Sequence, residues 1–219
     1  MDVMSTGGRI KGFAGKHASR VVAALFAGTV LLASAPAYSF LARPVIFAAI
    51  GNATKAPGGW LQFCAKDPEE CKPSTDAARD VILTPDLLQQ LFSINKHVND
   101  RVKWTSDREL YGMAENWTYP LDRGDCDDIV LLKRRLLAKA GWPVGSLLIT
   151  TVDDPNSGRH AVLTVRTDRG EMILDNQTPE ILFWYETGYR YLTRQSPTDP
   201  NIWVAFAEQP KRPSASTIR

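Results

Sequence analysis

The chain has 219 residues, of which 44% are hydrophobic and 23% are charged, which is typical of one folded domain with a short extra segment. Its formal net charge is +2, but residues 1–37 hold four bases and one acid, and the remaining residues hold 22 bases and 23 acids. This balance excludes a strongly basic surface, so we expect no nucleic-acid partner.

Residues 1–37 have the three parts of a secretory signal peptide. Basic residues come first, an apolar run covers 21–32, and small residues follow up to Ala37. The apolar run is shorter than the roughly twenty residues that a membrane-spanning helix needs. We therefore expect cleavage after Ala37 and export of a domain covering 38–209, followed by a disordered tail at 210–219. The alternative is a leader that stays attached as a membrane anchor.

The next segment, residues 51–80, is rich in Gly, Pro and charge, which predicts irregular structure held by Trp60 and Phe63. Cys64 and Cys71 flank a short loop here, and in an oxidising compartment they can form a disulfide. The third cysteine, Cys126, would then be unpaired. An unpaired thiol in an exported protein indicates nucleophilic catalysis; the alternatives are a sequestered buried thiol or a bond between Cys126 and one of the other two.

A helix is expected from Thr84 to Val102, because Pro85 suits the first helical position and apolar residues follow at helical spacing. Residues 103–124 show no period but hold several aromatic residues. A loop of this length in a compact domain is usually functional, and it leads directly to Cys126.

Cys126 is expected to start a second helix that ends at Gly141, which suits a left-handed position. Asp125 or a neighbouring acid can cap its first turn. A thiol at a helix N-terminus is favoured as the thiolate by the helix dipole. The helix presents an apolar stripe whose second position is Leu132 or Lys133, and its basic residues are expected to face mostly outward: Lys133, Arg134, Arg135 and Lys139.

After this helix the apolar period changes to two, which predicts strands at 146–152, 160–166, 171–175 and 202–207. Helices followed by an antiparallel sheet define an α+β fold, with the nucleophile-bearing helix packed on the sheet.

The hairpin between two of these strands predicts a catalytic pair. If 167–170 form its loop, Arg166 faces Glu171, and His160 and Asp175 lie on one face as diagonal neighbours. A carboxylate on one ring nitrogen of His160 would leave the other nitrogen for a thiol. Cys126 would complete a Cys-His-Asp triad.

Three ordered segments carry a family resemblance: Gly-Asp-Cys-Asp-Asp at 124–128, Gly-Arg-His-Ala-Val-Leu at 158–163 and Ile-Leu-Asp-Asn at 173–176. They resemble the catalytic blocks of the bacterial transglutaminase-like cysteine peptidases, and the likeness extends over about residues 57–206. The resemblance implies a papain-like, transglutaminase-type core in which Cys126 is the nucleophile, His160 the base and Asp175 its orienting partner.

The resemblance also implies a biological setting. Members of that family include periplasmic proteases that release a large surface adhesin and act downstream of a membrane receptor for cyclic-di-GMP. We therefore expect a periplasmic endopeptidase with a protein substrate of this kind. Transglutaminase or amidase-type acyl transfer remains an alternative, as does a non-catalytic binding module on the same fold.

Calcium is the cofactor that the resemblance implies. The matching ligand positions are Asp125 and Asp127, with Asp128 adjacent, and carboxylate oxygens suit a hard cation. These acids also raise the pKa of a neighbouring thiol, a conflict that a bound cation would remove. The alternative is that the three acids only cap the helix. Position 127 is often glutamate in the family, and the aspartate here has a shorter reach.

Overall fold

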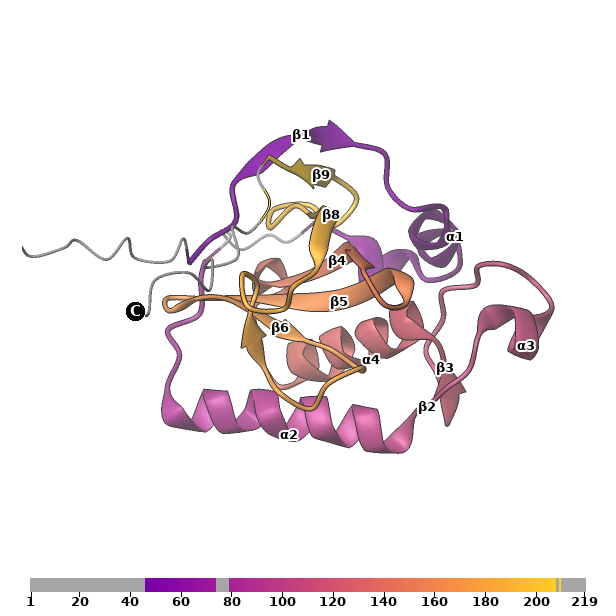
Figure 1. Cartoon of the computed structure of the whole chain (residues 1–219), viewed down its shortest axis with the longest axis horizontal. Helices are drawn as coiled ribbons and strands as arrows, with labels where there is room; N and C mark the ends of the chain where they lie inside the picture. The colour runs from indigo at the N-terminus through magenta and orange to yellow at the C-terminus, as the bar shows by residue number, and fades with distance from the viewer. Residues whose placement is uncertain (1–45, 74–78, 208, 210–219) are drawn as a thin grey trace, which may run out of the picture. The chain divides into compact units, whose positions relative to one another are not determined.

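An antiparallel sheet forms the centre of the computed structural model, which describes residues 46–73, 79–207 and 209 (Figure 1). The strand order is β1-β9-β8-β4-β5-β6-β7, and each neighbouring pair is antiparallel. The strands are β1 Ile50–Thr54, β4 Leu147–Asp154, β5 Gly158–Thr167, β6 Gly170–Leu174, β7 Leu182–Phe183, β8 Arg190–Gln195 and β9 Trp203–Phe206. A small parallel pair joins β2, Lys103–Trp104, to β3, Arg123–Gly124.

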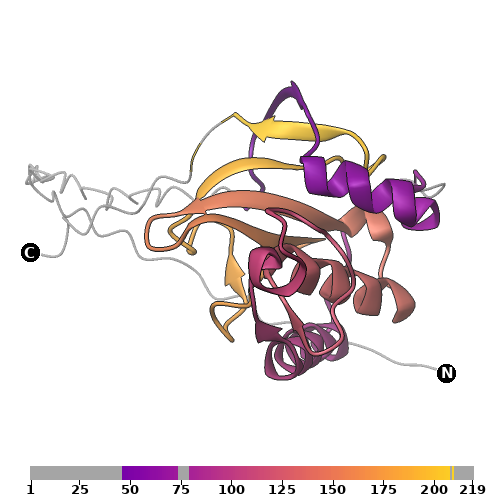
Figure 2. The same cartoon turned by 90° about the vertical axis from the view of Figure 1, so that its right-hand side faces the viewer.

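The helices lie mostly before the main strands in the sequence. They are α1 Gly58–Lys66, α2 Pro85–Arg101, α3 Asp107–Tyr111 and α4 Cys126–Lys139, with short 3-10 turns η1 Pro68–Cys71 and η2 Val144–Ser146. Helix α4 packs on β4 and β5, and α2 packs on the outer side of α4 (Figure 2). The predicted α+β class is therefore confirmed. Within the described ranges, no helix is long and apolar enough to cross a membrane.

Both faces of the central strands are buried, because successive side chains point to opposite faces and each face is covered by its own apolar cluster. On β5, Leu163 and Val165 enter the large cluster shared with α4, whereas Val162 enters a smaller cluster on the opposite face. Trp60 of α1 joins the large cluster with edge contacts to the rings of Trp117 and Trp203. The core therefore fixes α4 against the middle of the sheet.

The helix predicted from Thr84 is confirmed. The Thr84 hydroxyl accepts a hydrogen bond from the backbone N–H of Leu87 at 3.2 Å, which caps the first turn of α2. At the end of α4, Gly141 has a φ of 93°, the left-handed conformation that its position predicts.

The predicted hairpin register is also confirmed. Arg166 pairs with Glu171, and the last pair before the turn joins Thr167 to Gly170. Gly170 has a φ of 121°, a conformation that side chains rarely allow. The register matters for function because it sets which face of each strand a side chain occupies.

Several predicted details are wrong. Residues 51–80 are not irregular throughout, because they contain most of β1, all of α1, and η1. The strand β8 was not predicted.

The pairing of Cys64 with Cys71 is confirmed as a disulfide. The predicted leader at 1–37 and the tail at 210–219 lie outside the described residues.

The predicted outward orientation of the basic residues of α4 is wrong for two of them. Lys133 and Arg134 are buried. The guanidinium of Arg134 lies over the ring of Trp60, and its Nε donates to the carbonyl of Leu147 at 3.2 Å. An arginine stem packs well against apolar surface, so a base within an amphipathic pattern does not guarantee exposure.

Candidate active site

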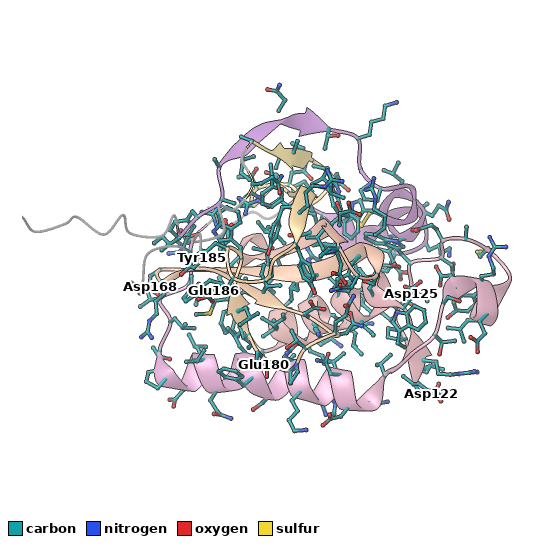
Figure 3. The ribbon with its side chains drawn as sticks, in the orientation of Figure 1. Asp122, Asp125, Asp168, Glu180, Tyr185 and Glu186 are labelled. Carbon is teal, nitrogen blue, oxygen red and sulfur yellow. A yellow bond between two sulfur atoms is a disulfide. The ribbon has the colours of Figure 1, made fainter. Side chains whose placement is uncertain are left out.

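Cys126 is the first residue of α4, at the point where the chain leaves β3 (Figure 3 labels the adjacent Asp125). Asp125 occupies the N-cap position, but its side chain makes no capping hydrogen bond. The carboxyl of Asp128 accepts instead from the backbone N–H of Thr118 at 2.8 Å and from that of Asp125. Asp128, three residues after Asp125, therefore holds the first turn of α4 that Cys126 begins.

The environment of the Cys126 thiol disfavours the thiolate. Burial raises the pKa of this thiol, and the charges of Asp127 and Asp125 raise it further. Hydrogen bonds from the backbone N–H groups of Ala161 and Asp127 act in the opposite direction without reversing the shift. The helix N-terminus alone does not activate the thiol, and the charge of the neighbouring acids has to be offset.

His160 and Asp175 form a buried hydrogen-bonded pair. Nε2 of His160 lies 2.8 Å from Oδ1 of Asp175. That oxygen also accepts from the backbone N–H of Gln177 at 2.9 Å, and Oδ2 accepts from the hydroxyl of Tyr189 at 2.6 Å. Burial alone would raise the pKa of Asp175, but these hydrogen bonds and the charge on His160 hold it below its ordinary value. The pairing leaves Nδ1 of His160 available for another partner.

Cys126 and His160 meet at one cavity of about 360 Å³. Ala161, which follows His160 on β5, donates its backbone N–H to the thiol. The other lining residues are Lys55, Pro57, Glu115, Trp117, Asp127, Thr151, Arg159 and Thr193. The structure thus brings the Cys126 end of α4 to the His160 end of β5, as the triad hypothesis requires.

The three predicted acids lie together with a fourth that the sequence analysis missed. Carboxyl oxygens of Asp107, Asp125 and Asp128 lie within 4.8 Å of one another, and Asp125 and Asp127 form a second such group with the Cys126 thiol. Asp107 comes from the start of α3, inside the long aromatic loop. The sequence feature that could have indicated Asp107 is its position directly after Ser106, a residue type that caps helices; Ser106 does cap α3.

The acids repel one another strongly. Burial raises the pKa of Asp127 well above its ordinary value, and Asp125 raises it further. Burial also raises the pKa of Asp128 to about 8, with a further contribution from Asp125. One oxygen of each acid is buried without a hydrogen-bond partner in the described structure: Asp107 Oδ1, Asp125 Oδ1, Asp127 Oδ2 and Asp128 Oδ2. Unpaired buried carboxylate oxygens at this spacing fit the donor set of a hard divalent cation such as Ca²⁺.

Trp117 lines the same cavity as Cys126. Its indole N–H donates to Oε2 of Glu115 at 2.9 Å. This hydrogen bond engages the indole N–H, so the structure assigns the ring of Trp117 to the wall of the cavity.

The sequence profile of the bacterial transglutaminase-like cysteine proteinase (BTLCP) family matches residues 50–211. The match covers the sheet, α4 and all the site residues described above. The chain belongs to this family and is a transglutaminase-like cysteine peptidase. No curated protein matches the chain.

Among solved structures, the chain is similar to LapG of Legionella pneumophila. The calcium-bound form has 21% identity and a TM-score of 0.47 over 59% of this chain and 74% of that one. The EGTA-treated form has 22% identity and a TM-score of 0.45, covering 55% of this chain and 67% of that one. A further LapG structure has 23% identity and a TM-score of 0.45, covering 54% and 68%.

Proposed function

We propose that this protein is an exported cysteine endopeptidase that uses Cys126, His160 and Asp175 as a catalytic triad. The observation that supports this most strongly is the 2.8 Å hydrogen bond between His160 Nε2 and Asp175 Oδ1 beside the cavity that Cys126 also lines. A histidine oriented through one nitrogen presents the other to the thiol. Export is supported by the disulfide, because such bonds persist in oxidising compartments.

In the proposed mechanism, Nδ1 of His160 takes the thiol proton while Sγ of Cys126 attacks the carbonyl carbon of a peptide bond. His160 then transfers that proton to the leaving amine, and a thioester remains on Cys126. Water attacks the thioester and gives a proton to His160, which returns it to the departing sulfur. Asp175 keeps Nε2 protonated throughout and stabilises the imidazolium. The backbone N–H of Cys126 is one donor to the oxyanion.

We further propose a Ca²⁺ site formed by Asp107, Asp125, Asp127 and Asp128. The unpaired carboxylate oxygens and the raised pKa values of Asp127 and Asp128 support it. A bound Ca²⁺ supplies positive charge that offsets these acids and so lowers the pKa of the Cys126 thiol. The acids themselves hold the α3 segment against the start of α4.

The substrate is a protein, as for other peptidases of this family. The family resemblance supports a large surface adhesin as that substrate, and a membrane receptor for cyclic-di-GMP as the regulator of its cleavage. Periplasmic localisation follows from the same reasoning. A comparison of the proteins that cells release with the parental gene and with the Cys126→Ala gene would identify the substrate by mass spectrometry.

The triad is tested with purified Cys126→Ala and His160→Ala variants. We expect both to melt near the parental temperature and to lose cleavage of the identified substrate. Labelling of Cys126 by iodoacetamide should be slower in His160→Ala than in the parent. If Cys126→Ala cleaved at the parental rate, the nucleophile assignment would be wrong. Addition of a primary amine separates hydrolysis from amide transfer, because only transfer incorporates the amine into the product.

A further inference from the structure

Lys133 is an unusual residue for the interior of a protein. Its side chain is 0% exposed, and its Nζ has no hydrogen-bond partner among the described residues. Burying an ammonium group without partners costs several kcal/mol, whereas methionine would fill a similar volume at little cost. A residue that destabilises the fold in this way points to a role in function.

The position of Lys133 in the fold is well defined. It lies on the side of α4 that packs against α2, one turn after Ile129, which shares a cluster with Val98 and Val102 of α2. Leu136, on the next turn, packs on the same cluster. Lys133 is therefore buried on the side of α4 that faces α2, and it is not among the residues that line the cavity shared by Cys126 and His160.

The segment after β6 lies against α2. Two asparagines of α2 bind its backbone: Asn99 Nδ2 donates to the carbonyl of Asp175 at 2.8 Å, and Asn95 Nδ2 donates to that of Pro179 at 3.4 Å. Figure 3 shows Glu180, the next residue of this segment, above α2. Hydrogen bonds from α2 thus hold the turn that carries Asp175.

Three hydrogen-bond acceptors on α2 and in the segment after β6 have no partner within the described part of the chain. The side-chain Oδ1 atoms of Asn95, Asn99 and Asn176 are buried and lack partners in the described structure. An ammonium group has three protons to donate and no acceptor. Lys133 Nζ and these three oxygens make no direct hydrogen bond with one another, so only a buried water can link the ammonium group to them.

Electrostatics also couple Lys133 to the site. Burial lowers the pKa of Lys133 to about 7, and the charge of Asp175 opposes this shift. The groups that act on Asp175 from the other elements are His160 of β5 and Tyr189 from the segment before β8, together with the backbone N–H of Gln177. Asp154, at the end of β4, is influenced by the charge on His160. The Asp175 carboxylate therefore interacts with His160 through a hydrogen bond and acts on Lys133 through its charge.

We propose that Lys133 is a positioning residue, which holds the 175–179 turn through the amides of Asn95, Asn99 and Asn176 so that Asp175 meets His160. This inference rests on the proposed triad. Lys133 acts on the turn from α4 and contacts neither the substrate nor the thiol. A misplacement of about 1 Å at such a site can cost on the order of a hundredfold in rate.

The test replaces Lys133 by methionine and uses Arg134→Met as the matched control, because Arg134 is the neighbouring buried base on α4 but contacts Trp60 and Leu147 instead. We expect Lys133→Met to melt at or above the parental temperature, and its kcat to fall by about tenfold or more with KM unchanged. The control should lose melting temperature and keep the parental kcat. Lys133→Arg, which retains the charge, should recover part of the lost kcat.

A second readout does not need a substrate. The proton on His160 Nε2, bonded to a buried carboxylate, gives a strongly downfield NMR signal, which should shift or broaden in Lys133→Met and persist in Arg134→Met. If Lys133→Met does not fold, the neutral Lys133→Gln is measured in its place. A parental kcat and a parental His160 signal in the folded neutral variant would overturn the proposal. A parent that cleaves nothing, yet whose His160 signal responds to Lys133, would refute the proposed function alone.

Discussion

Tyr189 donates its hydroxyl proton to Oδ2 of Asp175 at 2.6 Å, the oxygen that His160 does not use. The rings of Tyr189 and His160 also contact each other edge to face, with centroids 5.8 Å apart. Both oxygens of the carboxylate are therefore occupied, and its orientation is fixed by His160 of β5 and by Tyr189 of the segment before β8.

Replacement of Tyr189 by phenylalanine removes one of the hydrogen bonds that keep Asp175 ionised. We expect kcat to fall by roughly tenfold and the unfolding free energy to fall by about 1.5–3 kcal/mol, the usual range for a hydrogen bond to a charged group. Steady-state kinetics and urea denaturation measure the two effects. Tyr185→Phe is the matched control, because the ring of Tyr185 stacks on Phe183. Equal losses in both variants would contradict a specific role for Tyr189.

The acid cluster predicts a pH-dependent stability that calcium reverses. The pKa of Asp128 is 3.8 in an ordinary environment and is raised to about 8 by burial and Asp125. Between these values the folded state holds a proton that the unfolded state lacks, so without metal the stability from this group decreases as pH rises from about 4 to about 8. Asp175, whose pKa is lowered, acts only at more acidic pH.

Melting temperatures at pH 5 and pH 8, measured with EGTA and with added Ca²⁺, test this prediction. With EGTA we expect the protein to melt lower at pH 8 than at pH 5. With Ca²⁺ the ionised acids are the ligands, so the difference should vanish or change sign. Asp128→Asn should weaken the pH dependence in EGTA. Identical curves with and without Ca²⁺ would remove the case for the metal.

The disulfide between Cys64 and Cys71 joins α1 to η1, and Asn201 Nδ2 binds the carbonyl of Cys71 at 2.8 Å. Because the loop that it closes is short, we expect reduction to lower the unfolding free energy by about 2 kcal/mol. Urea denaturation with and without reductant should be done in Cys126→Ala, which removes the third thiol. A Cys64→Ser and Cys71→Ser double variant should not respond to reductant; a reductant effect in that variant would show that another group is responsible.

Gly59 lies against the wall of the active-site cavity. A Cβ at this position would come within 2.2 Å of Cδ1 of Trp117, whereas a Cβ on the preceding Gly58 would meet nothing within 4 Å. We expect Gly59→Ala to cost about 1–3 kcal/mol of stability, the range for overpacking, and to raise KM as Trp117 shifts. Gly58→Ala should be close to neutral in both. Equal melting temperatures for the two variants would contradict this reading of the packing.

Local rules accounted for much of the fold. The Thr84 cap with Pro85, the Gly141 position and the pairing of Arg166 with Glu171 follow from backbone preferences and a two-residue period, which depend only on neighbours in the sequence. The predicted register of the hairpin was sufficient to place His160 and Asp175 next to each other. These features were predictable because the information for them lies within a few residues.

The missed features depend on contacts between distant segments. Lys133 and Arg134 were assigned to solvent because a base on an amphipathic helix is usually exposed, and only the packing of α2 and Trp60 buries them. Asp107 joins the acids of α4 only because the 103–124 loop folds back on that helix. Tyr189 precedes β8, and β8 lies beside β4 on the side away from β5. The contact of Tyr189 with Asp175 therefore depends on the order of the strands in the sheet.

The register of the β5–β6 hairpin limits how this protein can change in length. A shift of one residue in the pairing register moves the side chains of a strand to its opposite face. A single insertion at the turn formed by Asp168 and Arg169 would therefore direct Asp175 away from His160. The loop between β4 and β5 precedes both strands of that hairpin. Additional residues there would leave the His160–Asp175 hydrogen bond intact, because they would not change the pairing of β5 with β6.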